Sequence, residues 1–258
     1  MILEKKLDNL AVYVFDSRQE MGKAAAQEAA NQIRALITKK GEVNIIFASA
    51  PSQRDMINSL LEQDIDWHKL RAFYQDEYIG LDPSHPAGFG NFLRRHIFDQ
   101  KPFMELHFME CDAGGVDRKI DEYIALLEKF PPDLIFLGVG ENGHLAFNEP
   151  DVADFNDPLR IKKIELDLAS RQQQVHDGCF DELSQVPTHA ITLTMSQILA
   201  VPSAIAVVPT KLKENAVDAA LNGPIQEACP ASALRRHPNA KLYLDRDSAG
   251  KGILSRTE

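Results

Sequence analysis

The stretch DLIFLGVGENGHLAFNEP, residues Asp133 to Pro150, joins an apolar strand to a glycine-rich loop that carries one histidine and one carboxylate. In a parallel α/β sheet the carboxyl ends of the strands open onto the ligand crevice, so polar side chains that follow such a strand lie at its mouth. Asn142, His144 and Glu149 are therefore candidate catalytic residues. An imidazole oriented by a carboxylate can pass protons in both directions near neutral pH.

Short β-branched or aromatic runs alternate with amphipathic stretches along the rest of the chain, which is the pattern of successive βα units. We therefore expect an α/β fold in which residues 1–258 form a single Rossmann-like domain, with a central, mostly parallel sheet flanked by helices. Nine strands are predicted, enough for one sheet and an edge hairpin. They are Leu10–Phe15, Val43–Ser49, Arg71–Asp76, Met104–Met109, Asp133–Val139, Arg160–Leu166, His189–Met195, Ala204–Pro209 and Ala240–Asp245.

Three helices are predicted between these strands, over residues 17–39, 116–130 and 212–221. Gly41 and Gly223 follow the first and the third helix, and Pro131 ends the second, as is usual for helix termini. The segment DVADFNDP, residues 151–158, has no periodicity and indicates a loop that could cover the site.

The composition excludes several classes of function. A net charge of −10 and a pI near 5.3 argue against a nucleic-acid or anionic-membrane partner, since both require a basic face. No run approaches the roughly 20 apolar residues of a membrane span. The three cysteines, Cys111, Cys179 and Cys229, have no metal-binding spacing and fit a reducing compartment. We expect a cytoplasmic protein without a metal site.

A second carboxylate pair, Asp76 and Glu77, ends another predicted strand. Consecutive residues of an extended chain point to opposite sides, so only one of the two is expected to face the crevice. The other one, together with Tyr78, is expected to be structural.

Two further strand ends carry groups that can bind phosphate. Lys211 and Lys213 follow one strand and open a helix, where an ammonium charge and free helical amides can act together. Ser49 and Ser52 offer hydroxyls after another strand. Solvated surface lysines and a simple helix N-cap are the alternative interpretations of these four residues.

The run Gly138-Val139-Gly140-Glu141-Asn142-Gly143 matches the dinucleotide fingerprint G-x-G-x-x-G. No helical pattern follows the last glycine, because the next residues carry two prolines and no amphipathic face. We expect instead a tight loop in which Gly140 and Gly143 bring backbone amides close to a ligand.

The motifs GVGENGHLAFNEP and FYQDEYIGL resemble the glucosamine-6-phosphate deaminase branch of the glucosamine-6-phosphate isomerase/6-phosphogluconolactonase family, and weaker similarity runs from about Val43 to Asp245. The resemblance implies that glucosamine 6-phosphate or galactosamine 6-phosphate is converted to the ketose 6-phosphate and ammonia without a cofactor. It implies Asp76 as the enolising base, His144 as the acid/base for ring opening and Glu149 as its orienting partner. Lys213 is implied as a phosphate ligand.

Three positions depart from the family pattern. Many members carry Asp at the position of Asn142, so this chain lacks a negative charge beside His144. The usual T-G-G-T-P phosphate loop is replaced by Ser49-Ala50-Pro51-Ser52-Gln53, whose proline has no N–H to donate. The family's second phosphate-binding arginine has no clean match, and Arg171 is the nearest candidate.

Two other functions stay open beside the deaminase: a sugar-lactone hydrolase of the 6-phosphogluconolactonase type, and a sugar-phosphate sensor without turnover. Arg160 and Lys162 match positions of an allosteric site in some hexameric relatives, but solvated basic residues on an edge strand are the preferred interpretation. A homo-oligomer is possible. The preferred hexosamine phosphate is not determined by these motifs.

Overall fold

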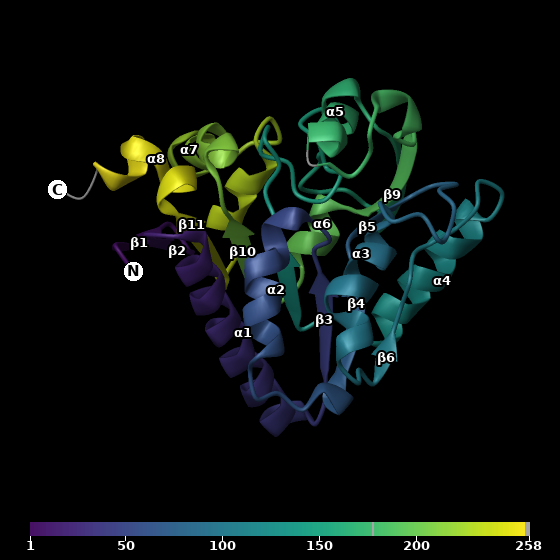
Figure 1. Ribbon diagram of the computed structural model, residues 1–258, viewed down its shortest axis with the longest axis horizontal. Coiled ribbons are helices and arrows are strands. Elements are labelled where there is room, and N and C mark those ends of the chain that lie inside the picture. Colours follow the sequence, from purple (N-terminus) through teal and green to yellow (C-terminus); the bar gives the residue numbers. More distant parts are fainter. Residues whose placement is uncertain (177, 256–258) are drawn as a thin grey trace.

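The main sheet has eight strands in the order β1-β2-β11-β10-β7-β3-β4-β6 (Figure 1). It is seen in a computed structural model that describes residues 1–176 and 178–255. Every pairing in this sheet is parallel except that of β1 with β2. The strands are β1 (Leu3–Leu7), β2 (Leu10–Phe15), β3 (Val43–Phe47), β4 (Leu70–Tyr74), β6 (Glu105–Leu106), β7 (Leu134–Leu137), β10 (Ala204–Val208) and β11 (Ala240–Asp245).

The central strands β3, β7 and β10 are buried along their whole length. A parallel strand covered on both faces has no polar side, which is why these strands are nearly continuous apolar runs in the sequence. The expected α/β class and the mostly parallel central sheet are confirmed.

Helices flank the sheet, and the three predicted ones are present. They are α1 (Arg18–Lys40), α4 (Val116–Lys129) and α7 (Glu214–Asn222), the last preceded by a 3₁₀ turn, Lys211–Lys213. Ser17 caps α1 by accepting from the N–H of Glu20 at 3.2 Å, and Gly41 ends it with φ +86°. The remaining helices are α2 (Arg54–Leu61), α3 (Phe89–His96), α5 (Leu168–His176), α6 (Met195–Leu199) and α8 (Arg246–Leu254).

Helix α1 packs closely against α2 and against strands of the main sheet. The buried positions of α1 are mostly alanines, and a Cβ atom at Gly22 would lie 2.7 Å from the Cβ atom of Asp55. Small side chains therefore allow α2 to start close to α1. This places the loop before α2 over the carboxyl end of β3.

Among the described residues no helix is long and apolar enough to span a bilayer.

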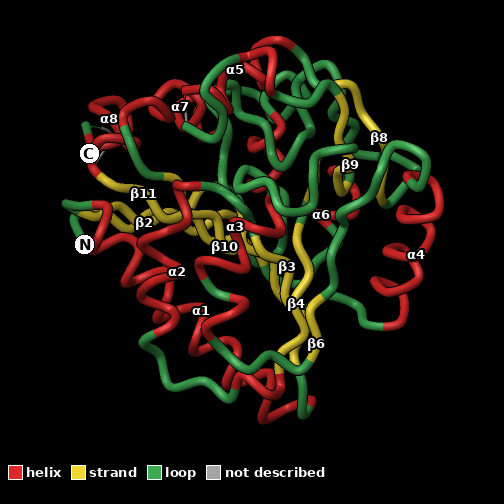
Figure 2. The backbone as a smooth tube through the Cα atoms, turned by 45° about the vertical axis from the view of Figure 1, so that its right-hand side comes forward, coloured by secondary structure: helices red, strands yellow, loops and turns green. Residues whose placement is uncertain are grey.

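A second, antiparallel sheet of order β5-β9-β8 lies apart from the first, as Figure 2 shows for β8 and β9. Its strands are β5 (Asp76–Tyr78), β8 (Ile161–Glu165) and β9 (His189–Leu193). The expectation that the strands form a single sheet is therefore wrong. The expected strand 71–76 breaks at Gln75, and its last residue joins the second sheet. The main sheet does have an edge hairpin, in which β2 pairs with β1, a strand that was not predicted.

Candidate active site

A cavity of about 380 Å³ opens at the carboxyl ends of the main-sheet strands. Four segments that follow strands supply its wall: Ser49 to Ser52 after β3, Asp76 after β4, Gly138 to His144 after β7, and Thr210 with Lys213 after β10. Six of the predicted site residues therefore line one cavity: Ser49, Ser52, Asp76, Gly140, His144 and Lys213. Asn142, Gly143, Glu149 and Arg171 are not among the lining residues.

His144 and Glu149 form a buried pair beside this cavity. Nδ1 of His144 lies 2.7 Å from Oε1 of Glu149, and the two side chains are 13% and 3% exposed. The side-chain amide of Asn142 donates to Oε2 of Glu149, and the hydroxyl of Ser170 on α5 donates to Oε1. The oxygen of Asn142 accepts from the backbone N–H of His144 at 3.2 Å. The predicted cluster of these three loop residues is thus present.

The ionised form of Glu149 is favoured by this arrangement. Burial works to raise the pKa of Glu149, but the hydrogen bonds from His144, Ser170 and Asn142 outweigh it, so the pKa lies below its usual range. An ionised carboxylate facing Nδ1 keeps the proton on that nitrogen and leaves Nε2 of His144 as the proton acceptor.

Gly140 and Gly143 shape the loop instead of presenting amides to a ligand. The N–H of Gly140 donates to the carbonyl of His144 at 3.0 Å, and that of Gly143 donates to the carbonyl of Gly140 at 3.1 Å. A Cβ atom at Gly140 would overlap the imidazole ring of His144. Gly143 has φ +90°, and a Cβ atom there would lie 2.8 Å from Sγ of Cys229. Both positions therefore require glycine.

Asp76 and Glu77 point in different directions, as alternation along a strand requires. Asp76 lines the cavity, whereas Glu77 accepts from the N–H groups of Phe89 and Gly90 at 3.1 and 2.8 Å, at the start of α3. Burial and the charge of Glu77 raise the pKa of Asp76 well above its usual range. Burial likewise raises the pKa of Glu77 to about 7, against the backbone hydrogen bonds that lower it. A carboxylate with a raised pKa is a stronger base once it is ionised.

The Ser49–Ser52 loop lies beside the end of β10. The side-chain amide of Gln53 donates to the carbonyl of Val207 at 3.1 Å, which holds the loop near Thr210 and Lys213. Ala50 is extended, with φ −143°, and Pro51 begins a 3₁₀ turn. The chain therefore passes this point without a positive φ, and the replaced glycines of the family pattern cause no backbone strain.

Arg171 is engaged away from the cavity. Its Nη2 atom donates to the carbonyls of Leu183 at 2.8 Å and Val186 at 2.9 Å, so it ties α5 to the segment before β9. Gln173 and Gln174 of the same helix line the cavity.

Three arginines that were not predicted from the sequence also line the cavity: Arg18, Arg54 and Arg95. Arg18 donates to the carbonyl of Pro51 at 2.7 Å and to the carboxylate of Asp55. Arg54 directly follows the Ser49–Gln53 loop. That position next to a predicted phosphate-binding loop is the one sequence feature that could have indicated a cavity residue among these three arginines. Basic groups around the cavity give it a positive local field in a protein whose net charge is −10.

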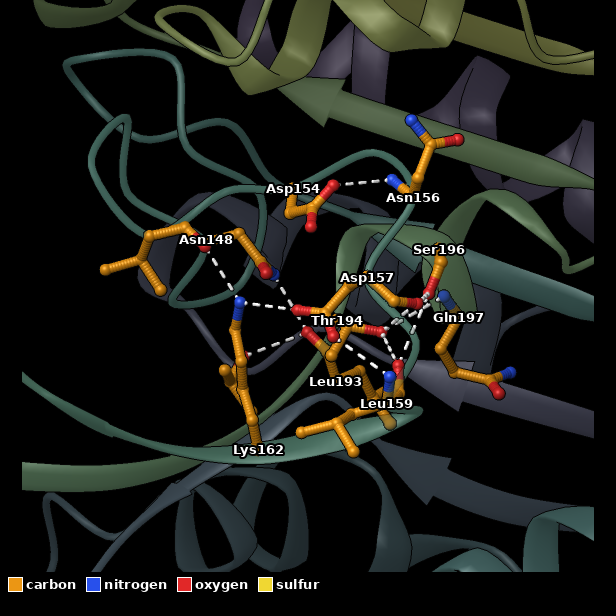
Figure 3. Close-up of polar contacts among 12 residues, drawn as sticks. Asn148, Asp154, Asn156, Asp157, Leu159, Lys162, Leu193, Thr194, Ser196 and Gln197 are labelled. Atoms are coloured by element: carbon orange, nitrogen blue, oxygen red, sulfur yellow. Dashed lines mark hydrogen bonds and ion pairs between the residues drawn. The ribbon is translucent and has the colours of Figure 1, made fainter.

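The segment 151–158 does not cover the cavity, contrary to the expectation. The ammonium group of Lys162 donates to the carbonyl of Val152 at 2.8 Å and to Asp157 at 2.7 Å, and the hydroxyl of Ser196 donates to the carbonyl of Asp157 (Figure 3). These bonds hold the segment against β8 and α6. Lys162 is mostly buried, so it is not the solvated residue that was expected.

Comparison with known proteins gives a consistent assignment. The family model described as "Glucosamine-6-phosphate isomerases/6-phosphogluconolactonase" matches residues 16–243. The chain is 31% identical over 211 residues to the glucosamine-6-phosphate deaminase of Streptococcus thermophilus, covering 82% of this chain and 88% of that protein. It is 28% identical over 240 residues to the deaminase of Lactobacillus helveticus, covering 93% and 96%.

Solved structures show the same fold. A monomeric glucosamine-6-phosphate deaminase has a TM-score of 0.82 at 24% identity, covering 94% of this chain and 99% of that chain. A 6-phosphogluconolactonase from Trypanosoma brucei has a TM-score of 0.75 at 17% identity, covering 96% and 98%.

Proposed function

Because this chain belongs to the glucosamine-6-phosphate isomerase/6-phosphogluconolactonase family, we propose that it is an amino-sugar-phosphate deaminase. The substrate would be glucosamine 6-phosphate or galactosamine 6-phosphate, and the products would be the ketose 6-phosphate and ammonia. The observation that carries the proposal is the convergence of Asp76, His144 and Lys213 on one cavity, with Glu149 behind the histidine. A base, a proton shuttle and an anion-binding group are the three components that this reaction requires.

Ring opening is the first step, and we assign it to His144. With Glu149 holding the proton on Nδ1, Nε2 is free to take the proton from the O1 hydroxyl and to deliver it to O5. The bond between C1 and O5 breaks, and the electron pair of O1 forms the aldehyde. The carboxylate of Glu149 stabilises the imidazolium that exists between the two transfers.

Isomerisation and loss of ammonia follow, with Asp76 as the base. Its carboxylate takes the proton from C2, and the electron pair forms the C1–C2 double bond while O1 takes up a proton from the protonated 2-amino group of the substrate. The same group returns a proton to C1, which leaves an iminium at C2. One water molecule adds to C2, the nitrogen leaves as the ammonium ion with both protons of the water, and the ketose keeps the oxygen. The charge balance requires that Asp76 be ionised at the start of each cycle.

The 6-phosphate would bind at the side of the cavity formed by the loops after β3 and β10. Lys213, Ser49 and Ser52 line that side. Lys213 is only 8% exposed, so its ammonium charge acts there with little screening by water. We do not assign a phosphate-binding role to Arg171, because its guanidinium is held by two backbone carbonyls.

Lactone hydrolysis on the same fold is the main competing function. That reaction needs an activated water molecule and no carbon base, so Asp76 would have no role in it. The relatives that are about 30% identical are deaminases, which also favours the first function.

One panel of substrates tests the proposal. The purified protein is incubated with glucosamine 6-phosphate, galactosamine 6-phosphate and 6-phosphogluconolactone, and the release of ammonia or acid is measured. Ammonia from either amino sugar supports the deaminase and also identifies the preferred C4 configuration. Acid release from the lactone alone would support the hydrolase, and binding without turnover would support a sensor.

A further inference from the structure

Thr210 has a backbone conformation that is rare for its residue type. Its φ is +81° and its ψ is 150°, a region that is essentially restricted to glycine because a Cβ atom meets the neighbouring backbone there. Threonine is also β-branched, which adds to the crowding. Thr210 lines the cavity three residues before Lys213. Such strain persists only where the surroundings hold the residue in place.

The carboxylate of Asp245, at the end of β11, is what holds Thr210. The N–H of Thr210 donates to both oxygens of Asp245, at 3.2 and 3.0 Å. Asp245 is 5% exposed, so these charge-assisted bonds are shielded from water. The same carboxylate caps α8 by accepting from the N–H of Ser248 at 2.8 Å, and the hydroxyl of Ser248 accepts from the N–H of Asp245 at 3.2 Å.

The backbone of Thr210 is hydrogen-bonded to that of Lys213. The carbonyl of Thr210 accepts from the N–H of Lys213 at 3.1 Å, which closes the 3₁₀ turn that leads into α7. If Thr210 relaxed to an ordinary extended conformation, its carbonyl would rotate away and this turn would open. The ammonium group of Lys213 would then lose its fixed approach to the cavity.

We propose that Asp245 is a positioning residue for anion binding: it holds Thr210 in the strained conformation that directs Lys213 at the phosphate group of the substrate. The inference rests on the proposed function for the identity of the anion. Positioning and simple electrostatics predict opposite effects of removing the Asp245 charge on anion affinity. A carboxylate near an anion site should by itself repel the ligand, so loss of its charge should tighten binding. Positioning predicts the opposite result.

The test measures the affinity of the protein for inorganic phosphate by calorimetry, together with KM and kcat for glucosamine 6-phosphate. Asp245→Asn is expected to weaken phosphate binding and to raise KM roughly tenfold, with kcat nearly unchanged. Ser248→Ala is the matched control, because it breaks the other half of the α8 cap and leaves the contact with Thr210 intact. Ser248→Ala is expected to lower the melting temperature without changing the phosphate affinity or KM.

Thr210→Gly provides the decisive comparison, since glycine adopts this conformation without strain. In the Thr210→Gly background, Asp245→Asn is expected to leave phosphate affinity unchanged. The proposal would be overturned by any of three results. These are a full loss of phosphate affinity in the double variant, a loss of phosphate affinity in Ser248→Ala, and tighter phosphate binding in Asp245→Asn. Should Asp245→Asn not fold, the comparison between Thr210→Gly and the double variant decides alone. Phosphate binding needs no turnover, so failure of the deaminase assay would leave this result interpretable.

Discussion

Nδ1 of His144 lies 2.7 Å from Oε1 of Glu149, and the other carboxylate oxygen accepts from the side-chain amide of Asn142. The Glu149 carboxylate beside the imidazole is thus itself held by hydrogen bonds. Asn142 acts here as a donor, which a carboxylate at this position could not do while ionised. The departure of this chain from the more common family residue is therefore compatible with a working acid/base pair.

We expect Glu149→Gln to lower kcat about a hundredfold, because His144 loses the carboxylate that fixes its tautomer and stabilises its charged form. Steady-state kinetics with glucosamine 6-phosphate measure the effect. Glu141→Gln removes a carboxylate from the same loop that makes no side-chain contact with His144 in the described part of the chain, and it serves as the control. A similar loss of kcat in both variants would mean that removing any negative charge from this loop has the same effect, which would contradict the pairing of Glu149 with His144.

Asp76→Asn is expected to abolish the exchange of solvent hydrogen at C2 while substrate binding is largely kept. Mass spectrometry of substrate recovered from deuterated water measures the exchange. Retained exchange would show that another group is the base.

The same variant should be more stable than the parent at neutral pH. The pKa of Asp76 is raised in the folded state, so its protonated form stabilises the fold at low pH. This contribution is lost as the pH rises through the usual value of 3.8 toward the raised folded pKa. Thermal melts should therefore show that Asp76→Asn raises the melting temperature, relative to the unsubstituted protein, more at about pH 8 than at about pH 4. A gain of equal size at both values would contradict the assignment.

Gly140→Ala is expected to cost about 1–3 kcal/mol of unfolding free energy and most of the activity, because the added methyl group would occupy the space of the His144 ring. Denaturant titration and kcat measure the two effects. Gly114→Ala is the control, since a Cβ atom there meets nothing closer than 3.7 Å. Full activity in Gly140→Ala would mean that the loop can move the imidazole without cost.

The parts of the fold that could be predicted from sequence are those with a local signal. Continuous apolar runs indicated β3, β7 and β10, and the serine cap and terminal glycine indicated α1. Strand β1 has the pattern LEKKL, half exposed at a sheet edge, and its stability comes from pairing with β2. The second sheet depends on the pairing of β5 with β9, which are more than a hundred residues apart. No local pattern encodes such a partner.

The site residues divide in the same way. Asp76, His144 and Lys213, which line the cavity, could be selected from the sequence because they follow strands, and parallel strands bring their carboxyl ends together. Arg95 was missed because its place at the cavity follows from the packing of α3, and an arginine on a short helix is usually solvated. Thr210 was missed because threonine gives no sign of a positive φ.

We expect Arg54→Gln to raise KM severalfold at low ionic strength, with kcat unchanged, because Arg54 is an exposed cation at the wall of the cavity. The effect should shrink as salt is added, since the screening length is about 10 Å at 0.1 M. Arg118→Gln is the control: its side chain is 82% exposed on α4 and it does not line the cavity. An equal rise in KM for both variants would assign the effect to net charge.

Glu77→Gln is expected to move the acidic limb of the kcat/KM profile to lower pH. Glu77 ionises near pH 7, and its charge is one of the two causes that raise the pKa of the neighbouring Asp76. Without that charge Asp76 loses its proton at lower pH, so the active form persists further into acid. The base is then also weaker, so kcat on the plateau should fall.

Glu110→Gln separates this effect from a general loss of buried charge. Glu110 raises the pKa of Glu77, and it is not among the causes of the shift at Asp76. Its removal lets Glu77 ionise at lower pH, so the charge beside Asp76 persists at lower pH. The acidic limb should therefore stay in place or move slightly upward in Glu110→Gln, opposite to its movement in Glu77→Gln. Both profiles are recorded well below the melting temperatures, because the amides of Phe89 and Gly90 lose a carboxylate acceptor in Glu77→Gln. If the limb moves downward in both variants, the charge of Glu77 is not what sets the basicity of Asp76.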